Sequence, residues 1–408
     1  MDGMSRFGEG LAVDTDVERA ARRATYGALS TVDGAPDLVT VFAGVTDPQD
    51  ADRIAASVHA MVMATGNERC VVVGALTPGV MGDARAVGPL LGGEPAVAVW
   101  AGRLPGVRIR PFHLQAKREG ESIAVGGLPE PWPDDRVVLV LADPHTFPAD
   151  GFVERSNEAL PGLPFIGGLV PGAAGRGSAR LIRGGVAYEE GAVGVMLGGP
   201  VDAAIAVSQG CRPVGPTMTV TAAEGNLLLG LAGRPALERL REILDELEPG
   251  ERESVATGLH LGVAMDEYAD QHESGDFLIR GVLGTEPERG GVAIGDVIEI
   301  GRTVRFQLRD AASAGRELDT VLTACRGRPG YGTIGGAIVV SCNGRAGDLF
   351  PQPLGAGHDI LAVRAGLGTN AVSGFFGAGE IGPVGGRNHL HGYTASVLAF
   401  ADPDAHVV

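Results

Sequence analysis

Cys342, Asn343 and Arg345 follow an apolar run in AIVVSCNGR, and Glu380 stands among glycines in GFFGAGEIGP. A thiolate is a nucleophile, and a guanidinium can donate two parallel hydrogen bonds to a carboxylate. A carboxylate accepts hydrogen bonds or pairs with an ammonium group. These residue types could therefore bind a small polar molecule or support thiol chemistry.

Arg345 and Glu380 could hold an amino acid between them. Its carboxylate would lie on Arg345 and its ammonium group on Glu380, while Phe375 or Phe376 would form a wall for its side chain. The alternative is purely structural. In that interpretation Arg345 and Glu380 form an internal ion pair that joins two loops, and both phenylalanines lie in the core.

The position of this polar group follows from the turn that the sequence predicts. Asn343 and Gly344 are typical of an Asn-Gly turn at the end of a strand, which would expose Cys342 and Arg345 at the carboxyl end of that strand. We expect Glu380 to lie close to Arg345 or Cys342 across one cleft.

Thiol catalysis is a second hypothesis. Cys342 beside an arginine would have a lowered pKa, and His389 or His391 could act as its base. No third member is evident, and cysteines at strand ends are usually structural, so we do not predict an enzyme. Cys211 and Arg212 have a similar setting earlier in the chain and could form a minor part of the same cleft.

His389 and His391 are two residues apart, so on a strand both side chains face one way, as a pair of metal or haem ligands would. Two ligands make half a metal site, and only Tyr393 and Asp402 are further candidates nearby. A single axial histidine would suffice for haem. We predict no cofactor, with a haem-binding gas sensor as the alternative.

The glycines of GFFGAGEIGP also spell G-x-G-x-x-G at Gly377, Gly379 and Gly382, as in dinucleotide-binding loops. That fingerprint requires a helix after the third glycine and a second strand. Here Pro383 and two further glycines follow, and residues 383–408 are too few for a helix and a strand. We therefore do not predict a dinucleotide site.

Composition limits the classes of function. The chain has 408 residues, 44% of them hydrophobic, and a net charge of -17, which predicts a globular protein that repels nucleic acid. The start of the chain does not resemble a signal peptide, and no apolar run is long enough to insert into a membrane, so we expect a cytoplasmic protein. The widely spaced cysteines predict thiols rather than disulfides or a zinc site. They are Cys70, Cys211, Cys325 and Cys342.

The 65 glycines lie among apolar runs, which is typical of tight turns and strand ends. Apolar residues recur at the spacing of a helix in three places, which are the segment after Asp50, the segment after Pro235 and residues 318–325. Strand-like runs are more numerous and alternate with turn residues. They cover 38–44, 70–76, 96–102, 137–143, 203–210, 276–284, 302–310 and 337–342.

An internal duplication connects two of these regions. PFIGGLVPGAAG (164–175) aligns without a gap with AVSGFFGAGEIG (371–382), and the preceding strands at 137–144 and 337–344 correspond in position. The two segments should therefore share one topology. In this alignment Cys342, Asn343, Arg345 and Glu380 stand opposite Ala142, Asp143, His145 and Ala173, so the polar group belongs to the second half alone. We predict an α+β fold of two related halves, each a mixed, mostly antiparallel sheet with helices packed on the outside.

Several segments resemble the FIST N and FIST C domains of intracellular signal transduction proteins. They are SQGCRPVGPTMTVT (208–221), DFLIRGVLG (276–284), VRFQLRDA (304–311), SCNGR (341–345) and GFFGAGEIGPVGGRNHLHGYTAS (374–396). The resemblance implies an N-terminal extension at 1–27, a FIST N domain at 28–228 and a FIST C domain at 229–408. One departure is Ala346, where the family pattern has glycine.

The resemblance further implies a sensory domain that binds small molecules such as amino acids. No output domain remains once both halves are assigned, so the signal would pass to a separate protein. The site residues predicted for the ligand are Cys342, Asn343, Arg345, Phe375, Phe376, Glu380, Cys211 and Arg212.

Overall fold

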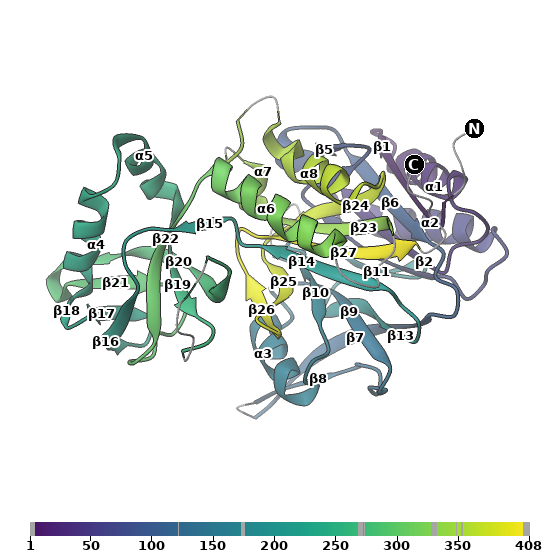
Figure 1. Cartoon of the computed structure of the whole chain (residues 1–408). Coiled ribbons are helices and arrows are strands. Elements are labelled where there is room, and N and C mark those ends of the chain that lie inside the picture. The colour runs from purple at the N-terminus through teal and green to yellow at the C-terminus, as the bar shows by residue number, and fades with distance from the viewer. Residues whose placement is uncertain are drawn as a thin grey trace. The chain divides into compact units, whose positions relative to one another are not determined.

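The computed structural model describes residues 5–120, 122–172, 176–267, 272, 274–327, 333–347, 349–351 and 354–402. The chain forms two compact units (Figure 1). Unit 1 consists of Met1–Ser208 and Leu318–Val408, and unit 2 consists of Gln209–Glu317. Unit 2 is therefore inserted in sequence between two parts of unit 1.

Unit 1 contains three mixed sheets. The strand order of the first is β1 (Phe7–Val13), β6 (Ala96–Gly102), β2 (Leu38–Gly44), β3 (Val71–Thr77), β11 (Leu181–Arg183) and β12 (Val186–Tyr188). That of the second is β26 (Arg387–His391), β25 (Glu380–Val384), β10 (Phe165–Leu169), β9 (Asp135–Ala142), β13 (Ala192–Gly198), β7 (Arg108–Glu119) and β8 (Ser122–Gly126). That of the third is β14 (Ala203–Ser208), β27 (Ala395–Asp402), β23 (Thr333–Cys342), β24 (Ala371–Gly377), β4 (Val80–Gly82) and β5 (Arg85–Val87).

One arrangement occurs in all three sheets. Two parallel strands are joined by a connection that contains a helix, and a third strand pairs antiparallel with the first of the two. Repeat 1 is β2, β3 and β6; repeat 2 is β9, β10 and β13; repeat 3 is β23, β24 and β27. The predicted correspondence between repeats 2 and 3 is confirmed, and repeat 1 is a further copy that the sequence analysis did not identify.

A glycine at the same register shows why the repeats share this geometry. Gly74, Gly167 and Gly374 lie beside the first strands of their repeats, opposite Val41, Val140 and Val339. A Cβ atom on any of these glycines would lie 1.8 to 2.0 Å from the carbonyl oxygen of the valine opposite. Only glycine therefore allows this close approach of the parallel strands.

Each repeat completes the sheet of another by means of a hairpin. The β4–β5 hairpin, which follows β3 within repeat 1, pairs with β24 of repeat 3, and the β11–β12 hairpin, which follows β10 within repeat 2, pairs with β3 of repeat 1. The β25–β26 hairpin, which follows β24 within repeat 3, pairs with β10 of repeat 2. The exchange is cyclic, so the three sheets are linked into one unit.

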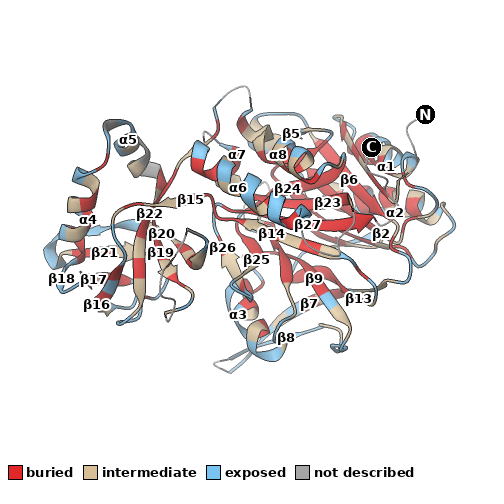
Figure 2. Cartoon of the chain, in the orientation of Figure 1, coloured by how far each residue is buried: buried red, intermediate tan, exposed pale blue. Residues whose placement is uncertain are grey.

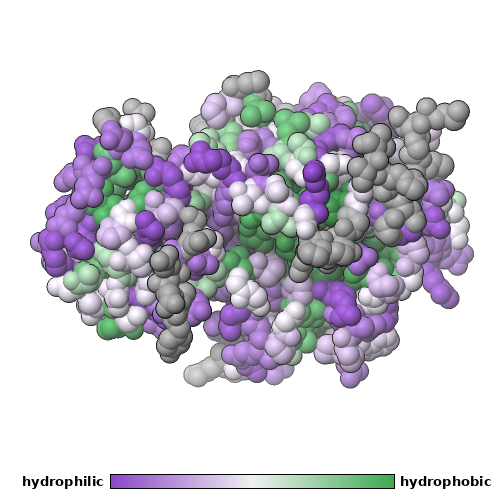
Figure 3. Space-filling model, viewed as in Figure 1, coloured by the Kyte–Doolittle hydropathy of each residue, from purple (hydrophilic) through white to green (hydrophobic). Residues whose placement is uncertain are grey.

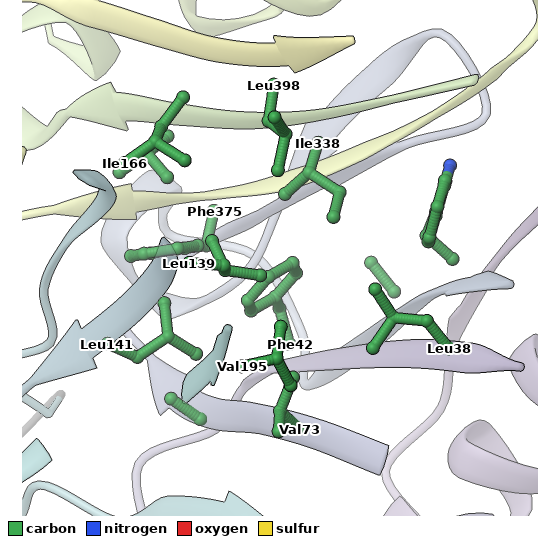
Figure 4. Close-up of a cluster of buried hydrophobic side chains, with 14 of the residues drawn as sticks. Leu38, Phe42, Val73, Leu139, Leu141, Ile166, Val195, Ile338, Phe375 and Leu398 are labelled. Carbon is green, nitrogen blue, oxygen red and sulfur yellow. The ribbon is translucent and has the colours of Figure 1, made fainter. Parts of the chain in front are cut away.

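The inner faces of the three sheets form a central core, in which Leu38, Leu139 and Ile338 meet side chains of the neighbouring sheets (Figure 4). Helices pack on the outer faces. The helices are α1 (Val17–Ser30) and α2 (Asp50–Met63) on the first sheet, α3 (Ala149–Ala159) on the second, and α6 (Ala311–Arg326) and α8 (His358–Leu367) on the third. Figure 2 shows the buried residues concentrated in these sheets.

Unit 2 has its own sheet and core. Its strands pair in the order β15 (Cys211–Pro213), β22 (Thr303–Arg309), β16 (Met218–Glu224), β17 (Leu227–Leu231), β21 (Gly291–Ile294), β20 (Phe277–Glu286) and β19 (Leu259–Ala264). Because β19 also pairs with β22, the pairings close into a ring. The remaining elements are β18 (Arg234–Pro235), α4 (Ala236–Asp245) and α5 (Pro249–Gly258). Figure 3 shows hydrophilic residues gathered over α4.

The predicted fold class is confirmed: the chain is α+β, with mixed sheets in which antiparallel pairs predominate and with helices on the outside. Short 3₁₀ turns complete the connections at Pro89–Leu91, Ser274–Asp276, Pro287–Arg289 and Gly355–Gly357. Among the helices in the described parts of the chain, none combines the length and apolarity needed to cross a bilayer.

Candidate functional site

Glu380 is the first residue of β25 and is fully buried. Its Oε2 accepts hydrogen bonds from the backbone N–H of Thr394, at 3.0 Å, and from the Thr394 hydroxyl, at 2.8 Å. The thiol of Cys342 is hydrogen-bonded to the same carboxyl. The structure thus brings together Glu380, Cys342 and Thr394, which we call the Glu380 cluster. Thr394 was not among the predicted site residues.

Burial raises the pKa of Glu380 to about 8. The hydrogen bonds from Thr394 and Cys342 and the charge of Arg345 act in the opposite direction, but they do not outweigh the loss of hydration. At pH 7 the carboxyl group is therefore mostly protonated. In that state it can donate a hydrogen bond, and it can transfer its proton to a base such as a neutral amine.

Arg345 pairs with Asp359, which corrects the alternative interpretation of an ion pair between Arg345 and Glu380. Its Nε donates to Oδ2 and its Nη2 to Oδ1, both at 2.8 Å, and both side chains are buried. Ser341 donates to Oδ2 at 2.6 Å. The Arg345 guanidinium, which was predicted to bind a ligand carboxylate, thus binds the carboxylate of Asp359 instead.

Asp359 lies in the first turn of α8, where an acidic residue is common in any helix. That frequency explains why the sequence analysis missed it. Burial alone would raise its pKa, but the charge of Arg345 and the hydrogen bonds from Arg345, His358 and Ser341 hold the pKa of Asp359 well below its ordinary value. The imidazole of His358 stacks on Phe350 with ring centroids 3.6 Å apart.

Cys342 and Asn343 do not form the predicted exposed turn. The chain passes from β23 directly into the short helix α7 (Asn343–Ala346), with Cys342 at its N-cap position. Cys342 and Arg345 are both buried, and the backbone N–H of Cys342 donates to the carbonyl of Thr394 at 3.0 Å. A side chain at Gly344 would collide with the ring of Tyr393, so the glycine serves close packing here rather than a turn.

Phe375 and Phe376 lie in the core, as the structural interpretation of the sequence predicts. Phe375 lies in the central core, with its ring centroid 4.7 Å from that of Phe42, and Phe376 lies in the core beneath the helices of the third sheet. Both side chains are fully buried. Successive residues of β24 thus face two different cores.

His389 and His391 lie on β26 with their ring centroids 5.9 Å apart. His391 is buried, stands opposite Glu380 in the strand pairing, and has its Nε2 3.0 Å from the carbonyl oxygen of Gly382. Within the residues that the structure describes, no group of three or more His, Cys, Asp or Glu side chains is arranged to hold a metal ion. All four cysteines of the chain are buried thiols.

Cys211 and Arg212 belong to unit 2, whereas the Glu380 cluster belongs to unit 1. Arg212 forms ion pairs with Asp310, at 3.0 Å, and with Glu251, at 2.7 Å. Cys211 is buried in a small apolar cluster that includes Phe277. These contacts account for both side chains within their own unit.

The repeats provide an internal comparison for Glu380. Val80 pairs with Phe375, Leu181 with Ala75 and Glu380 with Gly168, at equivalent positions of the three exchanged hairpins. Val80, Leu181 and Glu380 are all fully buried. The carboxyl group of Glu380 thus occupies a position that is apolar in the other two repeats.

This pairing corrects the predicted alignment, which placed Ala173 opposite Glu380. Ala173 lies outside the described residues, and Leu181 is the structural equivalent. The strand registers likewise place Cys342 opposite Asp143 rather than Ala142, because Val339 and Val140 face the equivalent glycines. Equivalent backbone hydrogen bonds support this register, since Cys342 N–H donates to Thr394 as Asp143 N–H donates to Gly191.

Comparisons with known proteins agree with the resemblance found in the sequence. A FIST N domain model matches residues 37–234, and a FIST C domain model matches residues 236–383. An uncharacterized protein of Mycobacterium tuberculosis (strain ATCC 25618 / H37Rv) is 38% identical over 398 residues, which cover 97% of this chain and 100% of that protein. An uncharacterized protein of Mycobacterium bovis is 37% identical over 399 residues, which cover 97% of this chain and 99% of that protein.

Proposed function

Since the chain belongs to the FIST family, whose domains are sensory domains of signal transduction thought to bind small ligands, we propose that it is a cytoplasmic sensor of a small polar, amino-acid-like metabolite. The Glu380 cluster would recognise an amine of this ligand. The signal would then pass to a separate partner protein.

The presence of a buried carboxyl group at an apolar position carries this proposal. Burying a carboxyl group costs free energy unless its hydrogen bonds and charge are compensated. Val80 and Leu181 fill the equivalent positions without that cost. The fold therefore does not require Glu380, and a ligand that pairs with it gives a reason for its presence.

The chemistry of the cluster favours an amine. A protonated Glu380 can transfer its proton to the neutral form of an amine, which leaves a carboxylate–ammonium ion pair, or remain neutral and donate a hydrogen bond to an uncharged acceptor. An ion pair in a site shielded from water is stronger than one at the surface. The Thr394 hydroxyl and the Cys342 thiol flank the carboxyl and could orient the ligand. Arg345 binds the carboxylate of Asp359 and contributes its charge to the cluster from a distance, instead of binding a ligand carboxylate.

The test compares the wild type with Glu380→Gln in calorimetric titrations against a panel of α-amino acids and small primary amines at pH 7. Glutamine keeps the shape and can still accept from Thr394, but it cannot form an ion pair. We expect at least one compound to bind the wild type and its affinity to fall tenfold or more in the variant, a loss of about 1.4 kcal/mol.

The matched control is Glu9→Gln, because Glu9 is a second largely buried carboxyl group of unit 1 with a raised pKa, of about 7. It accepts from the backbone N–H of Asp83 and lies outside the cluster. We expect the control variant to bind like the wild type. Equal binding by Glu380→Gln, or no binding by the wild type, would contradict the proposal.

A further inference from the structure

The strand β8 ends the second sheet of unit 1, and within the described residues no strand pairs with its outer edge. In the other two sheets β1 and β14 take the place of β7, since each pairs antiparallel with the third strand of its repeat, and both end their sheets. The strand β8 is therefore an addition to the architecture that the repeats share.

The edge of β8 lacks the usual protection of a sheet edge. Natural sheets cover or shorten their edge strands or place charges and prolines in them, because free backbone N–H and C=O groups pair readily with another strand. The sequence of β8, SIAVG, contains neither a charge nor a proline, and four of its five residues are exposed. The residues of β14, by contrast, alternate between buried and half-buried. The edge of β8 is thus suited to pair with a further strand.

The charge of the β7–β8 hairpin favours a second copy of this chain as the source of that strand. Residues 108–126 contain three arginines and one lysine against two glutamates, a net charge of +2, whereas the whole chain carries -17 and the remaining residues therefore carry -19. Two copies repel each other over most of their surfaces, but the basic hairpin of one is attracted to the acidic remainder of the other.

The apolar side chains of β8 suit pairing with an identical strand. If two copies of β8 pair antiparallel about Ala124, the strands match over their full length, and Ile123 of each copy lies opposite Val125 of the other. Val125 and Ala116, which is its neighbour on β7, pack against the core beneath α3. Ile123 points to the same face as Val125 but is 54% exposed. The pairing would cover Ile123 and continue this core from one copy into the next.

The same register keeps like charges apart. Lys117 stands beside Ala124 on β7, so the two copies of Lys117 are separated by three strand spacings, about 14 Å. This distance exceeds the Debye length of about 8 Å at physiological ionic strength.

We propose that the chain forms a two-fold symmetric homodimer in which two β8 strands pair antiparallel about Ala124. The second sheets of both copies then form one continuous sheet. Five residue pairs make a small interface, so we expect a dissociation constant in the micromolar range. This proposal does not rest on the proposed function.

Sedimentation equilibrium of the full chain across the micromolar range should show twice the mass of one chain. Lys117 is the single lysine of the sequence, so a crosslinker for amines reports on this hairpin. A disuccinimidyl reagent whose spacer spans the expected distance should link Lys117 to Lys117 of the second copy, as identified by mass spectrometry. Lys117→Arg should abolish this crosslink while the protein remains a dimer.

Cysteine variants test the register. Directly opposite residues of antiparallel strands have Cα atoms about 4.5 to 5.5 Å apart, which allows a disulfide. Oxidised Ala124→Cys should therefore form a covalent dimer, whereas two copies of Ser122→Cys lie roughly 13 Å apart and should not. The natural cysteines are all buried and do not compete.

Ile123→Lys places a charge in the interface and should weaken the dimer at least tenfold, while thermal melts confirm that the exposed substitution leaves the chain folded. The matched control is Val186→Lys, because Val186 is a 51% exposed residue of β12, which ends the first sheet. The control should dimerise like the wild type. The proposal is overturned if the wild type is monomeric throughout the micromolar range, if the dimer survives Ile123→Lys, or if Ser122→Cys forms a disulfide as readily as Ala124→Cys.

Discussion

The guanidinium of Arg345 lies on the carboxylate of Asp359 in a two-pronged contact, with both N–O distances at 2.8 Å and both side chains buried. This ion pair joins α7, at the end of β23, to the first turn of α8. It holds the segment that carries Cys342 in the cluster.

Removing one partner of this ion pair should be strongly destabilising. Asp359→Asn leaves a buried guanidinium without its counter-charge, and we expect the free energy of unfolding in urea to fall by about 3 to 5 kcal/mol. The double variant Arg345→Met with Asp359→Leu removes both charges and should recover most of that loss.

An exposed ion pair serves as the control. Arg155 and Glu158 pair on the surface of α3, with 75% and 62% of their side chains exposed. Glu158→Gln should change the free energy of unfolding by less than about 0.5 kcal/mol. If Asp359→Asn is as mild as this control, the buried pair does not stabilise the fold.

The raised pKa of Glu380 predicts a specific dependence of stability on pH. The folded state keeps this proton up to about pH 8, whereas the unfolded state loses it near the ordinary value of 4.5. The contribution of Glu380 is therefore fully present below pH 4.5 and is lost as the pH rises through 8. Glu380→Gln should remove the fall in unfolding free energy between pH 7 and 8.

The variant Glu9→Gln tests whether the fall in unfolding free energy between pH 7 and 8 belongs to Glu380 or to any buried carboxyl group. Burial raises the pKa of Glu9 to about 7. The contribution of Glu9 to the free energy of unfolding is therefore lost as the pH rises through 7, below the range from pH 7 to 8 in which the contribution of Glu380 is lost. Urea unfolding at intervals from pH 5 to 9 should show that Glu9→Gln flattens the profile below pH 7 only. Identical profiles for the two variants would contradict the assignment of the upper window to Glu380.

Leu181→Glu tests whether the surroundings of Glu380 are special. At the equivalent position of repeat 2 the carboxyl group would find Gly191 in place of Thr394 and the carboxylate Asp143 in place of Cys342. It would lose the donors and gain a like charge, so we expect at least about 3 kcal/mol of destabilisation in urea unfolding. Leu181→Met, which keeps the volume, should cost less than about 1.5 kcal/mol.

The glycines opposite the first strand of each repeat should resist substitution. Gly74→Ala and Gly374→Ala each force a methyl group into the carbonyl oxygen of the valine opposite, so the parallel strands must separate. We expect a loss of about 3 kcal/mol or more in unfolding free energy for each. Gly126→Ala, with no atom within 4 Å of the added carbon, should be within about 0.5 kcal/mol of the wild type.

Local pattern predicted the strands well, because buried strands are continuous apolar runs between glycines. The predicted strands 38–44 and 96–102 coincide with β2 and β6. The same pattern predicted the relation between repeats 2 and 3. Repeat 1 carries the glycine spacing too, in VVVGALTPGVMG (71–82), and could have been found by extending the comparison along the chain.

The rest of the fold and site depends on contacts between distant segments. The exchange of hairpins leaves no local signature, since β25 pairs with a strand more than 200 residues away. The proximity of Glu380 to Arg345 or Cys342 is predicted because these are the places where the second half of the sequence has polar groups that the first half lacks, and the structure brings Glu380 to Cys342. Asp359 was missed because its sequence position indicates an ordinary helix start, and only tertiary packing brings it to Arg345.

The cyclic exchange of hairpins has a consequence for synthesis on the ribosome. When repeats 1 and 2 have emerged, β3 already has its hairpin, but β10 must wait for β25, which is made only after the whole of unit 2. During that interval β10 presents an unpaired edge that could pair with other nascent chains. A chain terminated before residue 380 would keep this edge open permanently, and it should aggregate even though every strand of repeats 1 and 2 is present.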